Sequence, residues 1–277
     1  MIKDINYIKL TEEEYLLVER GWGKDVAENT VIQRFIYDSD DMEVTGFAAY
    51  PKQIDGKLPV IIWNRGGDNK SGLIDNFLAF GLLGEIANWG YLVLASQYRN
   101  DDEFGGSDIN DVINLIDLAD DFDFCDSDKL GMEGWSRGGM MTYLALTLTD
   151  KIRCAVIISG IADLQRNSKS INIFSNKLLE KINSKDEIKV NEQLIKRSAV
   201  HFVNNISKNT SVLLIHGTND KKVSYLDSKE MYEKLRFYNQ KGKYELKLIN
   251  GGDHYLKDSK KEISLLRKNW YDSFLKL

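Results

Sequence analysis

The sequence predicts an α/β fold with a mostly parallel central sheet of about eight strands and helices on both faces. Short apolar runs alternate along the chain with longer helical patterns, which is the order typical of parallel sheets. The later runs are continuously apolar rather than alternating in polarity, as expected for strands that are covered on both faces. A chain of 277 residues, 43% of them hydrophobic, is long enough to bury one large core of this kind.

The first two strands are expected to form an antiparallel hairpin. The runs VIQRFIY (31–37) and VTGFAAY (44–50) are rich in β-branched and aromatic residues and flank the polar turn DSDDME. The remaining apolar runs are expected to be the other strands: PVIIWN (59–64), YLVLASQ (91–97), KLGMEG (129–134), CAVIIS (154–159), SVLLIHG (211–217) and YELKLI (244–249).

Helical patterns lie between and after these strands. The sequence predicts helices within 75–90, 107–121, 137–150, 224–242 and 260–277. Residues 1–30 are expected to be an N-terminal helical appendage, and residues 31–277 a single domain. The segment 161–206 is rich in Asn, Ser, Lys and Ile and interrupts the alternation, so it is either a cap over a site or a long excursion.

Composition excludes several classes of function. The net charge of −5 and the absence of a basic stripe argue against a nucleic-acid partner. No apolar run is long enough to span a membrane, and the start of the chain lacks a secretion signal. Cys125 and Cys154 lie within apolar segments, as expected for buried thiols in a reducing compartment, so we expect a cytoplasmic protein. Three scattered histidines lack the spacing of metal ligands, and we expect no cofactor.

The stretch GMEGWSRGGMMTYLAL (131–146) carries the strongest chemical signal. Gly134 and Gly138 flank Ser136 at two positions on either side, which matches the Gly-x-Ser-x-Gly nucleophile elbow between a strand and a helix. Small neighbours are needed because the turn holds the serine in a strained backbone conformation above the sheet. The alternative is a glycine-rich helix start that is packed on a strand.

A nucleophilic serine needs a base, and the base needs an orienting acid. His254 follows the last strand in a glycine-bearing loop, at the sheet edge where α/β sites form. Asp220 follows the preceding strand, so the order Ser136, Asp220, His254 is that of α/β-hydrolases. His216 and His201 are expected to be structural. Asp163 and Asp253 remain rival acids.

Hydrolysis of an acyl group also needs N–H donors for the oxyanion. The backbone N–H of Arg137 follows the serine, and the loop IIWNRGGDN (61–69) offers Gly66 or Gly67 as the second donor. The alternative for the two glycines is an ordinary turn after a strand.

Four separated segments together resemble the prolyl oligopeptidase family of serine hydrolases, which has the α/β-hydrolase fold. They are QYRNDDEFGGSDINDVINLI, the elbow stretch, LLIHGTNDKKVSY and NGGDHYL. The resemblance implies Ser136 as nucleophile, Asp220 as acid, His254 as base, and main-chain oxyanion donors at Gly67 and Arg137. At the oxyanion loop, this sequence has Asn64-Arg65-Gly66-Gly67 where family members often carry His-Gly-Gly or a tyrosine. The family's peptidases usually carry a β-propeller, and we expect the catalytic domain without one.

Three functions are therefore weighed. The first is hydrolysis of small peptides, amides or esters through an acyl-enzyme; the second is a carboxylesterase or deacylase on the same residues. The third is a non-catalytic binding protein of this fold.

The sequence leaves two sets of residues open. The acidic residues Asp101, Asp102 and Glu103 form either a solvated loop or a rim for cationic groups, and Trp135 and Phe80 are either core or pocket residues. The partner is expected to be a small molecule or short peptide, and the oligomeric state is open.

Overall fold

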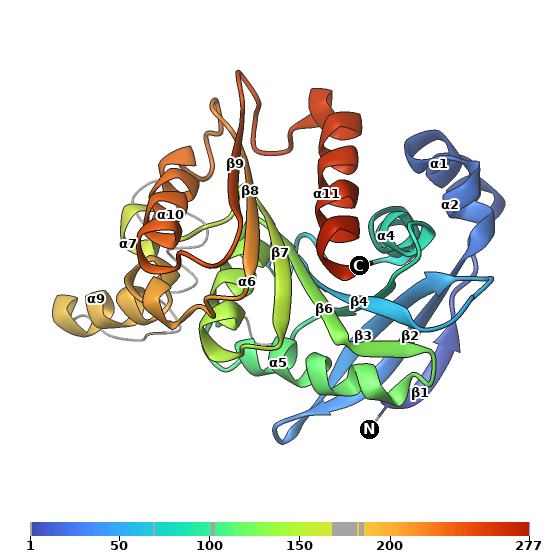
Figure 1. The fold of residues 1–277 in the computed structure, drawn as a ribbon. Coiled ribbons are helices and arrows are strands. Elements are labelled where there is room, and N and C mark those ends of the chain that lie inside the picture. The colour runs from blue at the N-terminus through green and yellow to red at the C-terminus, as the bar shows by residue number, and fades with distance from the viewer. Residues whose placement is uncertain (1, 69, 101–102, 168–181, 183–185, 277) are drawn as a thin grey trace.

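The computed structural model describes residues 2–68, 70–100, 103–167, 182 and 186–276 (Figure 1). A sheet of nine strands runs through them in the order β1-β2-β3-β5-β4-β6-β7-β8-β9. Strands β4 to β9 are parallel to one another, whereas β1, β2 and β3 join the sheet in antiparallel pairs. The expected mostly parallel sheet is confirmed, with one strand more than expected.

The elements follow the predicted alternation of strand and helix. The strands are β1 (Ile2–Tyr7), β2 (Thr30–Ser39), β3 (Met42–Pro51), β4 (Leu58–Asn64), β5 (Leu92–Ser96), β6 (Cys125–Trp135), β7 (Ile152–Ile158), β8 (Ser211–Gly217) and β9 (Tyr244–Ile249). The α-helices are α1 (Glu12–Trp22), α2 (Lys24–Asn29), α3 (Asn76–Leu78), α4 (Gly84–Asn88), α5 (Ile109–Leu118), α6 (Arg137–Leu148), α7 (Leu164–Asn167), α9 (Glu187–Lys196), α10 (Tyr225–Tyr238) and α11 (Lys260–Leu275). Within the described ranges, no helix has the length and apolar character needed to cross a membrane.

The N-terminal segment corrects one expectation. Residues 1–30 are not helical throughout, because Ile2–Tyr7 forms the edge strand β1, which pairs antiparallel with β2. Most side chains of β1 are exposed, so the segment lacks the apolar run that marks a strand in a sequence. The expected helices follow it: Thr11 caps α1 by accepting the N–H of Glu14, whose carboxylate accepts the Thr11 N–H in return.

Helices cover both faces of the sheet, as the continuously apolar strands predict. Helices α5, α6 and α10 pack on one face, and α4 and α11 on the other (Figure 1). Alternate residues of a strand serve the two cores: Val60 and Ile62 of β4 belong to the first, and Ile61 and Trp63 to the second.

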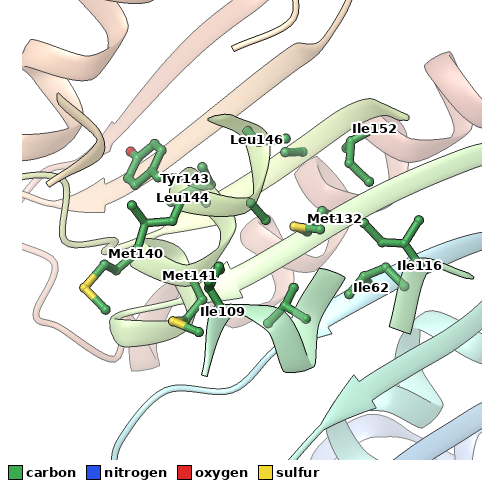
Figure 2. Close-up of a cluster of buried hydrophobic side chains, with 14 of the residues drawn as sticks. Ile62, Ile109, Ile116, Met132, Met140, Met141, Tyr143, Leu144, Leu146 and Ile152 are labelled. Atoms are coloured by element: carbon green, nitrogen blue, oxygen red, sulfur yellow. The ribbon is translucent and has the colours of Figure 1, made fainter. Parts of the chain in front are cut away.

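One core holds helix α6 in place behind the elbow. Met140 and Met141 of α6 lie with Met132 of β6 and Ile62 of β4 among the buried side chains of this cluster (Figure 2). Burying a side chain of this size stabilises the fold by roughly 1.5–3 kcal/mol. The first turn of α6 is thereby fixed relative to the end of β6, where Ser136 lies.

The segment 161–206 is helical on both sides of its undescribed part. Residues 168–181 and 183–185 of the expected excursion lie outside the described residues. The helix α7 precedes them, and α9 with the short 3-10 segments Ala199–His201 and Val203–Asn205 follows. The buried carboxylate of Asp227 in α10 accepts the backbone N–H groups of Ala162 and Asp163, which ties the start of this segment to α10.

The two cysteines agree with the sequence prediction, whereas the helix predicted within 75–90 differs from it. Cys125 and Cys154 are buried and free, as expected. The helix predicted within 75–90 is instead divided into α3, a π-helical turn (Ala79–Leu83) and α4. Gly81 of that turn lies against the Trp22 ring, where a Cβ atom would lie only 2.7 Å from the ring.

Candidate active site

The turn between β6 and α6 has the backbone conformation of a nucleophile elbow. Ser136 is the single residue between the strand and the helix, and its φ of 59° and ψ of −119° lie in a region that non-glycine residues rarely adopt. A Cβ atom on Gly134 would lie 2.0 Å from the Gly138 carbonyl oxygen, and one on Gly138 would lie 1.9 Å from that of Asn64. Both positions therefore require glycine.

Backbone hydrogen bonds hold the elbow in this conformation. The Ser136 N–H donates to the carbonyl of Ile158 at the end of β7, at 2.9 Å. The Ser136 carbonyl accepts the N–H of Met140 in the first turn of α6, at 3.2 Å. Since α6 begins directly after the serine, the positive end of its helix dipole lies at Ser136, where it favours negative charge.

Asp220 and His254 are brought together from separate loops. Asp220 follows β8, and His254 lies between β9 and α11. The Nδ1 atom of His254 lies 2.7 Å from Oδ2 of Asp220, whose side chain is fully buried, while that of His254 is 7% exposed. Sequence analysis singled out these two residues from position alone, and here they form a hydrogen-bonded pair.

The histidine loop contacts the elbow directly. The indole Nε1 of Trp135, the residue before Ser136, donates to the carbonyl of His254 at 3.0 Å. Strands β6, β7, β8 and β9 are neighbours and parallel, so the loops after them lie at one edge of the sheet. The serine elbow, the aspartate and the histidine therefore share that edge.

The carboxylate of Asp220 accepts hydrogen bonds at both oxygens. Oδ1 accepts the backbone N–H groups of Lys222 at 2.8 Å and Val223 at 2.9 Å. Oδ2 is shared between His254 and His216, whose Nε2 lies at 3.2 Å. Burial opposes ionisation of Asp220, but the hydrogen bonds from the two histidines outweigh it and hold its pKa well below the usual range. Asp220 is therefore ionised at neutral pH.

The rival acids have other partners. Asp163 accepts the backbone N–H of Arg166 at 3.1 Å, as a residue does at the start of a helix. Asp253 accepts the N–H of Tyr255 at 3.1 Å and so stabilises its own turn. Neither carboxylate is the partner of the His254 ring, which pairs with Asp220.

The loop after β4 lies against the elbow. A Cβ atom on Gly66 would lie 2.9 Å from the Trp135 carbonyl oxygen and 3.6 Å from Cβ of Ser136, so the backbone here approaches the serine closely. Gly67 has a φ of +72°, and its carbonyl accepts a hydrogen bond from Nη1 of Arg137 at 3.2 Å. The N–H of Arg137 is in the first turn of α6, where backbone N–H groups have no partner within the helix.

The side chain of Arg137 is a buried anchor for this loop, which sequence analysis did not predict. It is 0% exposed and pairs with the equally buried Asp108, with 2.7 Å between Nη2 and Oδ2. Its guanidinium lies over the rings of Tyr98 and Phe104, at 4.9 Å and 4.4 Å from their centres. Burial raises the pKa of Asp108, and the charge of Arg137 opposes that rise.

A second arginine supports the same loop. Arg65 donates from Nη1 to the carbonyls of Gly66 at 3.1 Å and Asp68 at 3.0 Å. It also lies 4.7 Å from the centre of the Tyr98 ring. The side chains of Arg65 and Arg137 thus hold the carbonyls of residues 66–68, and both guanidinium groups lie over the Tyr98 ring.

The other residues named from the sequence have structural contacts. Phe80 is buried in the core, and the ring of Trp135 packs beside that core. His201 ends a short 3-10 segment and contacts Gln165. Asp101 and Asp102 lie outside the described residues; the carboxylate of Glu103 accepts the N–H of Ser107 at 2.6 Å. In the described part of the chain, no cluster of three or more His, Cys, Asp or Glu residues is suited to bind a metal.

Comparison with known proteins gives the family. Residues 94–276 match the model of the prolyl oligopeptidase family. The chain belongs to this family. It is therefore a hydrolase of the serine peptidase class. It is 25% identical over 228 residues to the uncharacterized peptidase YtmA of Bacillus subtilis, and the match covers 80% of this chain and 86% of YtmA.

Solved structures show the same fold. The acylaminoacyl peptidase of Pyrococcus horikoshii matches 97% of this chain with a TM-score of 0.76 and 20% identity. The puromycin-hydrolyzing peptidase of Mycobacterium tuberculosis matches 88% with a TM-score of 0.69 and 19% identity. The matched regions are 44% and 39% of those two chains. The chain likewise spans 36% of the uncharacterized peptidase YuxL of B. subtilis, with 26% identity.

Proposed function

We propose that the protein hydrolyses small peptide, amide or ester bonds through an acyl-enzyme intermediate, with Ser136 as nucleophile, His254 as base and Asp220 as acid. The observation that carries the proposal is the hydrogen bond between Asp220 and His254 beside a strained serine elbow. An ionised carboxylate, an imidazole paired with it and a serine at a strained strand-to-helix turn, all at one sheet edge, are the parts that acyl transfer requires.

The proton moves along this set of residues in each half-reaction. Since ionised Asp220 accepts from Nδ1–H of His254, the lone pair of Nε2 is left to take the Ser136 proton. The serine oxygen bonds to the substrate carbonyl carbon, and the imidazolium returns the proton to the leaving amine or alcohol as that bond breaks. A water molecule then repeats the two steps and releases the acid and Ser136.

The negative oxygen of each tetrahedral intermediate needs two donors. We assign one to the backbone N–H of Arg137 and the other to Gly66 or Gly67, in the loop that lies against the elbow. The contacts of Arg65 and Arg137 with the carbonyls of this loop support the assignment, because they hold the backbone in place before substrate binds. Loss of one such donor typically slows turnover by roughly a hundred- to a thousandfold.

Labelling with a fluorophosphonate tests the nucleophile. We expect the wild-type protein to gain one adduct on Ser136, and Ser136→Ala to gain none and to lose hydrolysis of both an acyl ester and a dipeptide anilide. Ser159→Ala is the matched control, since Ser159 is a buried serine at the end of the next strand with a φ of 48°. If Ser136→Ala keeps full activity, the proposal is wrong; the ratio of anilide to ester turnover separates peptidase from esterase.

A further inference from the structure

A second imidazole lies on the carboxylate that orients His254. His216 is the penultimate residue of β8 and is 0% exposed. Its Nε2 atom lies 3.2 Å from Oδ2 of Asp220 and 3.2 Å from the carbonyl oxygen of Val223, and its Nδ1 atom lies 2.7 Å from Oγ of Ser228. The same Oδ2 atom is 2.7 Å from Nδ1 of His254.

These partners determine where the ring protons lie. The polar partners of Nε2 of His216 are a carboxylate oxygen and a carbonyl oxygen, which only accept hydrogen bonds, so Nε2 carries a proton. In the neutral ring Nδ1 is then an acceptor, and the Ser228 hydroxyl donates to it. His254 has the opposite arrangement, with the proton on Nδ1, because Nδ1 is its atom that faces Asp220.

We propose that His216 is a positioning residue for the reaction: its Nε2–H fixes the Asp220 carboxylate and divides the negative charge of Oδ2 between two imidazoles. This inference rests on the proposed function for its catalytic consequence, but not for the ring arrangement itself. With Oδ1 fixed by two backbone N–H groups and Oδ2 by two rings, the carboxylate cannot rotate away from His254.

The division of charge affects the base. A carboxylate that accepts a second N–H attracts a positively charged imidazole less strongly, because its negative charge is shared between two donors. Other ionisable groups also lie beside His254: the Tyr255 ring is 5.3 Å away, its hydroxyl accepts from Lys222 at 2.6 Å, and Lys257 lies over the same ring. These groups are unchanged when His216 is replaced, so a shift on replacement is due to the His216 contact.

Imidazole nitrogen NMR tests the ring arrangement without any substrate. The chain has only three histidines, and His201→Gln removes the exposed one, so the remaining two signals are separable. At pH 8 we expect one ring protonated at Nε2, assigned to His216 by its loss in His216→Gln, and one protonated at Nδ1, which is His254. A His216 ring protonated at Nδ1 would overturn the proposal even if the protein proves to be an active hydrolase.

The pH dependence of kcat/KM on an acyl ester tests the catalytic consequence. His216→Leu removes the donor at similar volume, and we expect the acidic limb to move up by about one pH unit and kcat to fall about tenfold with KM unchanged. His216→Gln offers an amide N–H near the position of Nε2 and is expected to restore the wild-type limb. His201→Gln, which lies away from the site, is the control and leaves the profile unchanged.

The outcomes separate this inference from the proposed function. A folded His216→Leu variant with reduced thermal stability but an unchanged acidic limb and kcat would reduce His216 to a packing residue and overturn the inference. If His216→Leu does not fold, Ser228→Ala serves instead, because it frees Nδ1 and loosens the ring while Asp220 keeps its partner. A smaller upward shift of the limb supports the inference, and no shift contradicts it. If the fluorophosphonate does not label Ser136 in the wild-type protein, that result instead contradicts the proposed function.

Discussion

Replacing Arg137 by methionine is expected to lower both the stability of the protein and its turnover of an ester substrate. The Arg137–Asp108 pair is 0% exposed on both sides, and the two charged atoms are 2.7 Å apart. Methionine fills much of the space but leaves Asp108 as a buried acid without its cation. Breaking a buried pair in this way costs about 3–5 kcal/mol of the free energy of unfolding.

The cost should depend on pH with a definite sign. Burial already raises the pKa of Asp108, and Arg137 is the main opposing charge, so the variant raises that pKa further. An acid whose pKa is higher in the folded than in the unfolded protein takes up a proton on folding. Its stability penalty is absent at low pH and grows as pH rises above the unfolded value of about 4. Arg137→Met should therefore lose less stability at pH 5 than at pH 8.

The activity of the same variant reports on the loop after β4, to which we assign the second oxyanion donor. Methionine keeps the backbone N–H at position 137 but removes the donor to the Gly67 carbonyl. Arg65 still holds the loop through Gly66 and Asp68, so we expect kcat to fall about tenfold, less than for loss of a whole oxyanion donor, with KM unchanged.

Urea unfolding at pH 5 and 8, with ester turnover at a temperature where every variant is folded, measures both effects. Arg267→Met is the matched control: Arg267 of α11 is nearly buried and pairs with Glu133 of β6 at 2.6 Å. It should lose comparable stability and keep its kcat. The reasoning would be refuted if Arg137→Met lost less than about 1 kcal/mol, or if Arg267→Met slowed turnover equally.

Two further predictions follow from the elbow and the acid. Gly138→Ala places a Cβ atom 1.9 Å from the Asn64 carbonyl oxygen, so we expect thermal unfolding to show a loss of more than about 3 kcal/mol in the free energy of unfolding. Gly21→Ala is the control, because it has open space at its Cβ, and it should be neutral or stabilising. Equal melting temperatures for the two variants would contradict this prediction. Asp220 has a lowered pKa in the folded protein, so its stabilising contribution is present above pH ~4 and is lost as pH falls below it. The stability gap between wild type and Asp220→Asn should accordingly shrink from pH 6 to pH 3, and a constant gap would argue against an ionised, hydrogen-bonded Asp220.

The parallel half of the sheet was predictable because burial on both faces leaves a local mark. The predicted run 211–217 coincides with β8, all of whose residues are buried. The run 244–249 also coincides with a strand, but β9 lies at the sheet edge and most of its residues are exposed or half-buried. Strand β1 was missed because an exposed edge strand needs no apolar run, and only its pairing with β2 defines it. Such long-range pairing has no signature within the segment itself.

The site shows the same division between local and distant information. Chain order and loop position predicted the Asp220–His254 pair, because the fold places those loops at one edge. The ion pair of Arg137 with Asp108 joins residues 29 positions apart, and nothing in either segment indicates it. The contact of His216 with Asp220 spans four residues in HGTND, but a strand-end histidine is usually a packing residue, so the spacing alone did not single it out.

His254, the imidazole proposed as the base, lies in the loop after β9, 118 positions beyond the serine at 136. A polypeptide that ends before this loop contains Ser136 and Asp220 but lacks the imidazole that pairs with that carboxylate through Nδ1. On the proposed function, hydrolysis therefore requires the chain to be folded as far as this loop, and ester turnover would report on the C-terminal third as well as on the elbow.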